Sequence, residues 1–125
     1  MTADNRLRAL RIALVAFGIV FTLGIYPLSI VWPSGWSWLP AQPALFQMIL
    51  GIYATLGVFL LLAVRDPARH ISLLWFTVWS SVVHAAIMAR HAMMDGHTGH
   101  LFGDVAALVM VAVVIGLLMP RPQPA

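Results

Sequence analysis

The sequence contains no cysteine and no lysine, and only 9% of its 125 residues are charged. The absence of cysteine excludes disulfides, thiolate zinc sites and iron–sulfur ligation. A soluble domain of ordinary composition is about 25% charged, so this chain has too few charged side chains to cover a surface that faces water. Hydrophobic residues make up 62% of it. The composition therefore indicates a protein whose surroundings are mostly lipid.

All seven cationic side chains are arginine, and the formal net charge is +3. In a soluble protein this balance suggests a nucleic-acid partner. Here the arginines flank apolar segments, and we interpret them as anchors that set the topology in a membrane. We expect no nucleic-acid partner.

Four apolar segments cover about residues 10–32, 44–64, 71–94 and 101–119. A helix needs roughly 20 apolar residues to cross a bilayer core of about 30 Å, and each segment is close to that length. Helices are expected because backbone groups cannot stay unpaired in hydrocarbon. The sequence predicts an all-α, membrane-spanning four-helix bundle with antiparallel up-down connectivity, in which residues 1–125 form a single transmembrane domain.

The arginines also predict the orientation of the bundle. Six of the seven fall on one side if all four segments cross the membrane: Arg6, Arg8, Arg11, Arg65, Arg69 and Arg121. Short loops rich in arginine face the cytoplasm. We therefore expect both termini in the cytoplasm and the protein in the bacterial inner membrane. Arg90 lies toward the other side, where Asp95 is expected to offset it.

The connections fit this plan. Residues 32–40 are predicted to be an outer loop whose tryptophans suit the membrane interface, and residues 65–69 a tight cytoplasmic turn. Residues 95–100 are predicted to form a short outer turn. Tyr26-Pro27 predicts a kink in the first helix.

Small residues predict where the first two helices approach closely. Gly18, Thr22 and Ser29 share one face of the first segment. In the second segment, small residues share a face that we expect to pack against a neighbouring helix: Gly51, Ala54 and Val58.

Histidine and aspartate gather between the middle of the third segment and the start of the fourth: His84, His91, Asp95, His97, His100 and Asp104. An ionisable group at membrane depth costs roughly 2.5–3.5 kcal/mol on insertion scales, so such groups tend to have a purpose. The cluster predicts where this protein acts. Asp95 and His97 are interpreted as part of a solvated turn.

On a helical projection of the third segment, one stripe is polar apart from a single methionine: Thr77, Ser81, His84, Met88 and His91. His84 lies near the centre of the segment, and His91 two turns outward. This spacing suits a proton relay, or one ring that binds a cofactor while the other contacts its edge. The structural alternative is a neutral His84 that hydrogen-bonds a serine or threonine hydroxyl and holds helices together.

His100 and Asp104 have i, i+4 spacing, which lets both point the same way on a helix. Asp104 could serve as a helix cap, because an acid in the first turn complements the helix dipole. It could also orient a histidine. Imidazole and carboxylate are ligands for divalent metals, and the predicted metal ligands are His91, His100 and Asp104.

Residues 84–95 resemble the haem-ligating helix of the cytochrome b subunit of succinate dehydrogenase, in which His, an Arg-His pair and Asp recur at this spacing. The resemblance implies that His84 is an axial ligand of haem b, with Arg90 and His91 near the propionates. The whole chain is similar in layout to a family of small four-helix bacterial integral membrane proteins of unknown function. Residues 75–84 and 99–104 carry that likeness, which implies no activity.

We predict a small integral membrane protein with a buried His/Asp site that binds a metal ion or haem, or relays protons. The alternative is a non-catalytic accessory or structural subunit of a larger membrane complex. The expected partners are the lipid bilayer and either further copies of the chain or such a complex. An enzyme ranks last, because the sequence shows no Ser-His-Asp arrangement, no phosphate-binding glycine loop and no cysteine. No catalytic residue is predicted.

Overall fold

The computed structural model describes residues 1–37 and 43–122, and every regular element in these ranges is helical. The elements are α1 (Ala3–Ile19), the π-helical turn η1 (Val20–Gly24), α2 (Ile25–Val31), α3 (Pro33–Trp36), α4 (Pro43–Ala63), the 3₁₀ turn η2 (Pro67–His70), α5 (Ile71–Met94), the 3₁₀ turn η3 (Thr98–Leu101) and α6 (Asp104–Leu118). Four stretches are long and apolar enough to cross a membrane: Ala3–Val31, Ala44–Ala63, Pro67–Met94 and Thr98–Leu118. The prediction of an all-α chain with four membrane-capable segments is confirmed.

The first helix starts at Ala3, well before the apolar segment that begins near residue 10. Thr2 caps it, because its side-chain oxygen accepts a hydrogen bond from the backbone N–H of Asn5 at 3.2 Å. The apolar segment marks the part of the chain suited to lipid, whereas the cap marks the start of the helix.

A kink was expected at Tyr26-Pro27, and the structure has a π-helical turn, η1, just before these two residues. Pro27 has no backbone N–H, and a proline ring clashes with the carbonyl four residues earlier, which here belongs to Leu23. The widened turn η1 contains that residue, and the N–H of Ile25 bonds the carbonyl of Val20. The helix thus continues into α2 through a locally wider turn.

The outer loop predicted at residues 32–40 contains one helical turn, α3, so the loop prediction is wrong for that part. Pro33 occupies the first turn, where its missing N–H costs nothing. The N–H of Ser37 donates to the Pro33 carbonyl at 2.8 Å and closes the turn. Residues 38–40 of the predicted loop lie outside the described residues.

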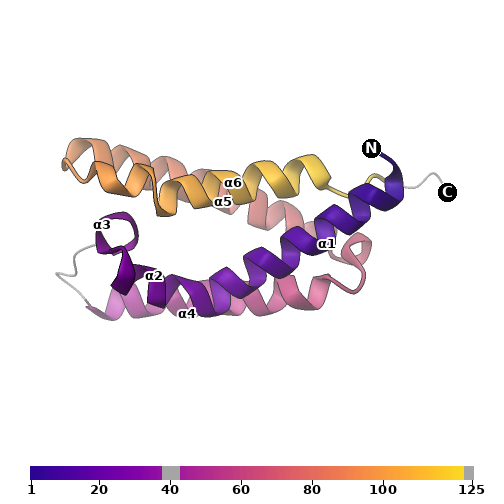
Figure 1. The fold of residues 1–125 in the computed structure, drawn as a ribbon, viewed down its shortest axis with the longest axis horizontal. Coiled ribbons are helices and arrows are strands. Elements are labelled where there is room, and N and C mark those ends of the chain that lie inside the picture. Colours follow the sequence, from indigo (N-terminus) through magenta and orange to yellow (C-terminus); the bar gives the residue numbers. More distant parts are fainter. Residues whose placement is uncertain (38–42, 123–125) are drawn as a thin grey trace.

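The long helices are arranged as two pairs (Figure 1). α5 and α6 form the most extensive pair, α1 and η1 run along α4, and α2 leads from η1 to α3. Most buried residues of α5 and α6 recur at alternating spacings of three and four, apart from one longer interval: Leu74, Val78, Ser81, Ala85 and Ala92 on α5, and Val105, Leu108, Ala112, Ile115 and Met119 from α6 onward. Thr77, Asp104 and Val111 are buried beside this pattern. This seven-residue pattern lets two helices stay in contact along their length.

α1 and α4 approach closely at Gly18 and Gly57, which are both buried. A Cβ added at Gly18 would lie 2.7 Å from Cγ of Leu61, and one added at Gly57 would overlap Thr22 and the backbone of Gly18. The expected face of the first helix is therefore at the contact. The expected face of the second lies away from this crossing, because a Cβ at Gly51 would meet nothing within 4 Å. Its packing against a helix of another subunit stays a prediction.

We expect Gly57→Ala to destabilise the fold by about 1–3 kcal/mol, because it forces extra volume into a closely packed crossing. Gly51→Ala is the matched control on the same helix. It should be neutral or slightly stabilising, since alanine favours helix over glycine. Unfolding of both variants in detergent micelles, followed by circular dichroism, measures the difference. Equal stabilities would contradict the close α1–α4 crossing.

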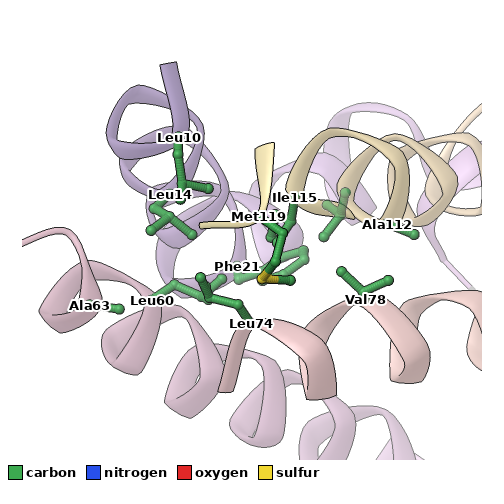
Figure 2. Close-up of a cluster of buried hydrophobic side chains, with 11 residues drawn as sticks. Leu10, Leu14, Phe21, Leu60, Ala63, Leu74, Val78, Ala112, Ile115 and Met119 are labelled. Atoms are coloured by element: carbon green, nitrogen blue, oxygen red, sulfur yellow. The ribbon is translucent and has the colours of Figure 1, made fainter. Parts of the chain in front are cut away.

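The main apolar core joins the two pairs (Figure 2). Its buried residues are Leu10, Leu14, Phe21, Leu60, Ala63, Leu74, Val78, Val111, Ala112, Ile115 and Met119. It lies toward the end of the bundle at which α1 starts and α6 ends (Figure 1), which we call the terminal end. The opposite end, with α3 and η3, is called the α3 end.

At the terminal end, two arginine side chains donate hydrogen bonds to backbone carbonyls at or just after the ends of other helices. Nη2 of Arg6 donates to the carbonyls of Leu117 at 2.6 Å and Met119 at 3.2 Å. Nη2 of Arg11 donates to the carbonyl of Arg65 at 3.1 Å, just after α4. The last carbonyls of a helix have no partner within it, and basic side chains satisfy them favourably. These arginines therefore bind helix ends as well as marking one side of the molecule.

Candidate functional site

The two helix pairs are joined by a hydrogen bond between Tyr53 of α4 and His84 of α5. The Tyr53 hydroxyl bonds Nδ1 of His84, and the two ring centroids lie 5.5 Å apart. Phe21, in the π-helical turn, stands edge-on to Tyr53 with ring centroids 5.1 Å apart at 70°. The widened turn of the first helix thus supports the ring of Tyr53, which in turn orients the imidazole.

A second pair, His100 and Asp104, is buried where η3 leads into α6. Nδ1 of His100 lies 3.1 Å and 3.0 Å from the two carboxylate oxygens of Asp104. Only 3% of His100 and 7% of Asp104 is exposed. The prediction that i, i+4 spacing turns both groups the same way is confirmed.

Asp104 also stabilises the start of its own helix. Its Oδ1 accepts a hydrogen bond from the backbone N–H of Val105 at 2.8 Å, and an acid in the first turn complements the helix dipole. Asp104 therefore stabilises the start of α6, and it also contacts the histidine that it was expected to orient. One carboxylate has both roles.

The two pairs lie beside one small apolar cluster. Tyr53 packs against this cluster, which includes Ala85 of α5 and Val105 of α6. Ala85 follows His84 in the chain, and Val105 follows Asp104. We call the four residues Tyr53, His84, His100 and Asp104 the interior polar cluster. They come from α4, α5, η3 and α6.

The polar stripe of α5 faces inward only in part. Thr77 and Ser81 are buried, and the Thr77 hydroxyl donates to the carbonyl of Leu73 at 2.9 Å. Its hydroxyl is therefore satisfied within its own helix. The hydroxyl that bonds His84 comes instead from a tyrosine on another helix.

His91 lies apart from the interior polar cluster. Its side chain is 54% exposed, and its Nδ1 lies 3.8 Å from Asp95, which was expected to offset Arg90. The buried positions on this part of α5 are Ala85 and Ala92, so His91, next to Ala92 on the helix, reaches the surface. Arg90 is exposed as well.

Among the described residues, no three His, Cys, Asp or Glu side chains gather in a way that could hold a metal ion. His91, His100 and Asp104 all lie within those residues. Their role as metal ligands, and the role of His84, Arg90 and His91 around haem b, stay predictions.

Sequence reasoning missed Tyr53. The available signal was a phenol near the middle of the second apolar segment, because a buried Tyr hydroxyl usually has a hydrogen-bond partner. The sequence does not show which face of α4 turns inward. The small residues of that helix pointed to a different face, and Tyr53 was left out.

The short helix α3 covers the buried pair at the α3 end. It lies against η3, which contains His100, and against Gly103, which directly precedes Asp104. A Cβ added at Gly99 would lie 2.6 Å from the carbonyl oxygen of Ser34, and one added at Gly103 would overlap the backbone of Gly35. The absence of side chains at these positions lets α3 sit directly on the backbone beneath it.

Comparison with known proteins identifies a family and no function. A family model described as a family of unknown function (DUF6632) matches residues 5–122. No curated protein matches the chain, and no solved structure does.

Proposed function

The chain belongs to this family of unknown function, and we propose that its interior polar cluster is a proton-exchanging site of a membrane protein. The observation that carries the proposal is that two hydrogen-bonded pairs lie beside the same small core cluster, between helices apolar enough to span a membrane. Ionisable residues within such helices commonly mark proton relays. Histidine is the side chain whose ordinary titration range is nearest to neutral pH.

The chemistry of each member supports this role. Imidazole and phenol groups both donate and accept hydrogen bonds, and a carboxylate stabilises an adjacent imidazolium. Asp104 contacts His100 directly, and Tyr53, the partner of His84, packs on the cluster that contains Val105. In the proposed function a proton moves between the two rings beside this carboxylate. Tyr53 holds His84 at Nδ1 and fixes the orientation of its ring.

The topology proposed for the chain is an antiparallel up-down bundle with both termini in the cytoplasm of a bacterium. The arginines Arg6 and Arg11 lie at the terminal end and bind helix ends there, and positive charge favours the cytoplasmic side. The α3 end then faces outward. Protons would reach the cluster from the outer side.

The apolar core limits what the site does. It lies toward the terminal end (Figure 2) and consists entirely of hydrophobic side chains. The cluster is therefore proposed to exchange protons with the outer side and with a bound molecule or partner subunit, not to conduct them across the bilayer. This function also suits the alternative role as a subunit of a larger membrane complex.

Nitrogen-15 NMR of labelled histidine in lipid nanodiscs tests the proposal. We expect the signals of His84 and His100 to change together as pH is varied, because the proposal has both rings exchange protons beside Asp104. Asp104→Asn should uncouple them, whereas Asp95→Asn should leave them coupled. The control is well matched, since Asp95 pairs with His91 at the same i, i+4 spacing on the surface. Independent responses in the unmodified protein would overturn the proposal.

A bound haem b or divalent metal is a second candidate, favoured by one observation. A histidine that ligates a metal usually has its other nitrogen held by a hydrogen bond, and Nδ1 of His84 is held by Tyr53. An absorption spectrum and elemental analysis of the purified protein decide between the candidates. A Soret band or bound metal lost in His84→Ala would favour the cofactor. A colourless, metal-free protein with coupled histidines would favour proton exchange.

A further inference from the structure

We propose that α3 is a lid that controls access from the α3 end to the buried pair His100–Asp104. The inference rests on the proposed proton-exchanging site, and it adds how that site is reached. The experiment below measures access itself, so the lid and the proton-exchange proposal can fail independently.

Exposure changes abruptly along the chain next to the lid. The turn formed by residues 95–98 is exposed throughout. Two residues later His100 is only 3% exposed, although it precedes the long helix α6. α3 packs on η3 at this point, so it separates the buried pair from the exposed turn.

The lid packs directly against two glycines, Gly99 and Gly103. The contacts at Gly99 and Gly103 place the backbone of Ser34 and Gly35 directly against the chain beneath. Gly35 is itself packed under the indole of Trp32, because a Cβ there would lie 2.7 Å from Cε2 of that ring. These close contacts require glycine, and a single methyl group at Gly103 would push the lid outward.

The lid is small and weakly held compared with the long helices. It is one turn, closed by the bond from the Ser37 N–H to the Pro33 carbonyl at 2.8 Å. Trp32 and Ser37 flank it with non-helical backbone angles, at φ −131°, ψ 69° and φ −107°, ψ 112°. The lid can therefore move as a unit without unwinding a long helix.

The closed position also carries an energetic cost. Within the described part of the chain, Nε1 of Trp36 is buried without a hydrogen-bond partner. A buried unsatisfied donor costs about 1–3 kcal/mol. Opening the lid would let the indole N–H bond water, which lowers the free-energy difference between closed and open positions.

Chemical labelling of histidine tests the lid. Diethyl pyrocarbonate modifies accessible imidazoles, and mass spectrometry of the protein in nanodiscs gives a rate for each histidine. In the unmodified protein His100 should react at least about tenfold more slowly than the exposed His97, because it reacts only when the lid opens. Gly103→Ala should raise the rate at His100 severalfold and leave that at His97 unchanged.

Two further variants keep the test decisive. Trp32→Ala removes the ring that packs on Gly35 without adding a clash, so it should also raise the rate at His100. Gly51→Ala is the control, because the space around Gly51 is open. Circular dichroism verifies that each variant is folded. Unchanged rates at His100 in both folded lid variants would overturn the proposal.

Discussion

Asp104→Ala is expected to lower the free energy of unfolding by about 2–4 kcal/mol, because two buried groups each lose a hydrogen-bond acceptor. The substitution leaves buried His100 without the carboxylate that contacts its Nδ1. It also removes the acceptor of the Val105 N–H and the acid at the start of α6. Equilibrium unfolding in mixed detergent micelles measures the loss.

The chain offers an internal control for this effect. His91–Asp95 has the same residue types at the same spacing, but both side chains are 54% exposed and the atoms lie 3.8 Å apart. Exposed pairs contribute little, so Asp95→Ala should change stability by no more than about 0.5 kcal/mol. Similar losses in the two variants would show that Asp104 is not buried in the folded protein.

Tyr53→Phe is expected to remove the polar connection between α4 and α5. Phenylalanine keeps the ring packed against Phe21, but it leaves Nδ1 of His84 without the hydroxyl. We expect a loss of about 1–2 kcal/mol in stability, because a partly buried imidazole nitrogen loses its hydrogen bond. The nitrogen-15 signals of His84 should change strongly, while those of His91 should not.

A double-mutant cycle separates this hydrogen bond from general packing. Tyr53→Phe and His84→Ala should show a coupling energy of about 0.5–3 kcal/mol, as contacting residues do. Tyr26→Phe is the control, because Tyr26 is the other tyrosine in the chain and is 60% exposed. Additive effects of the Tyr53 and His84 substitutions would mean that the two side chains do not bond.

The features that sequence reasoning predicted well depend on local pattern. The hydropathy of the sequence shows how long each apolar segment is, so the four stretches able to cross a membrane were predictable. The His100–Asp104 pair was predictable from its i, i+4 spacing, and the two side chains meet although His100 lies in η3 and Asp104 begins α6. Pro27 predicted an irregular first helix, although not that it would be a π-helical turn.

The features that sequence reasoning missed depend on how helices rotate against each other. Tyr53 reaches His84 only because α4 turns that face toward α5, and nothing in the order of its residues fixes the rotation. His91 shares the projected stripe with His84 but lies on the surface next to buried Ala92. The lid α3 has a sequence typical of a loop, and its contacts with Gly99 and Gly103 join residues far apart in the chain.

The position of the apolar core has an electrical consequence. A layer of mostly hydrophobic side chains has a low dielectric constant, so we expect a large share of a membrane voltage to fall across the end of the bundle that holds that core. Moving one elementary charge through the whole field is worth roughly 2.3 kcal/mol per 100 mV. In the proposed orientation, a proton arriving from outside reaches His84 after crossing only a fraction of that field. Protonation of the cluster should therefore follow the pH of the outer side closely and depend only weakly on voltage.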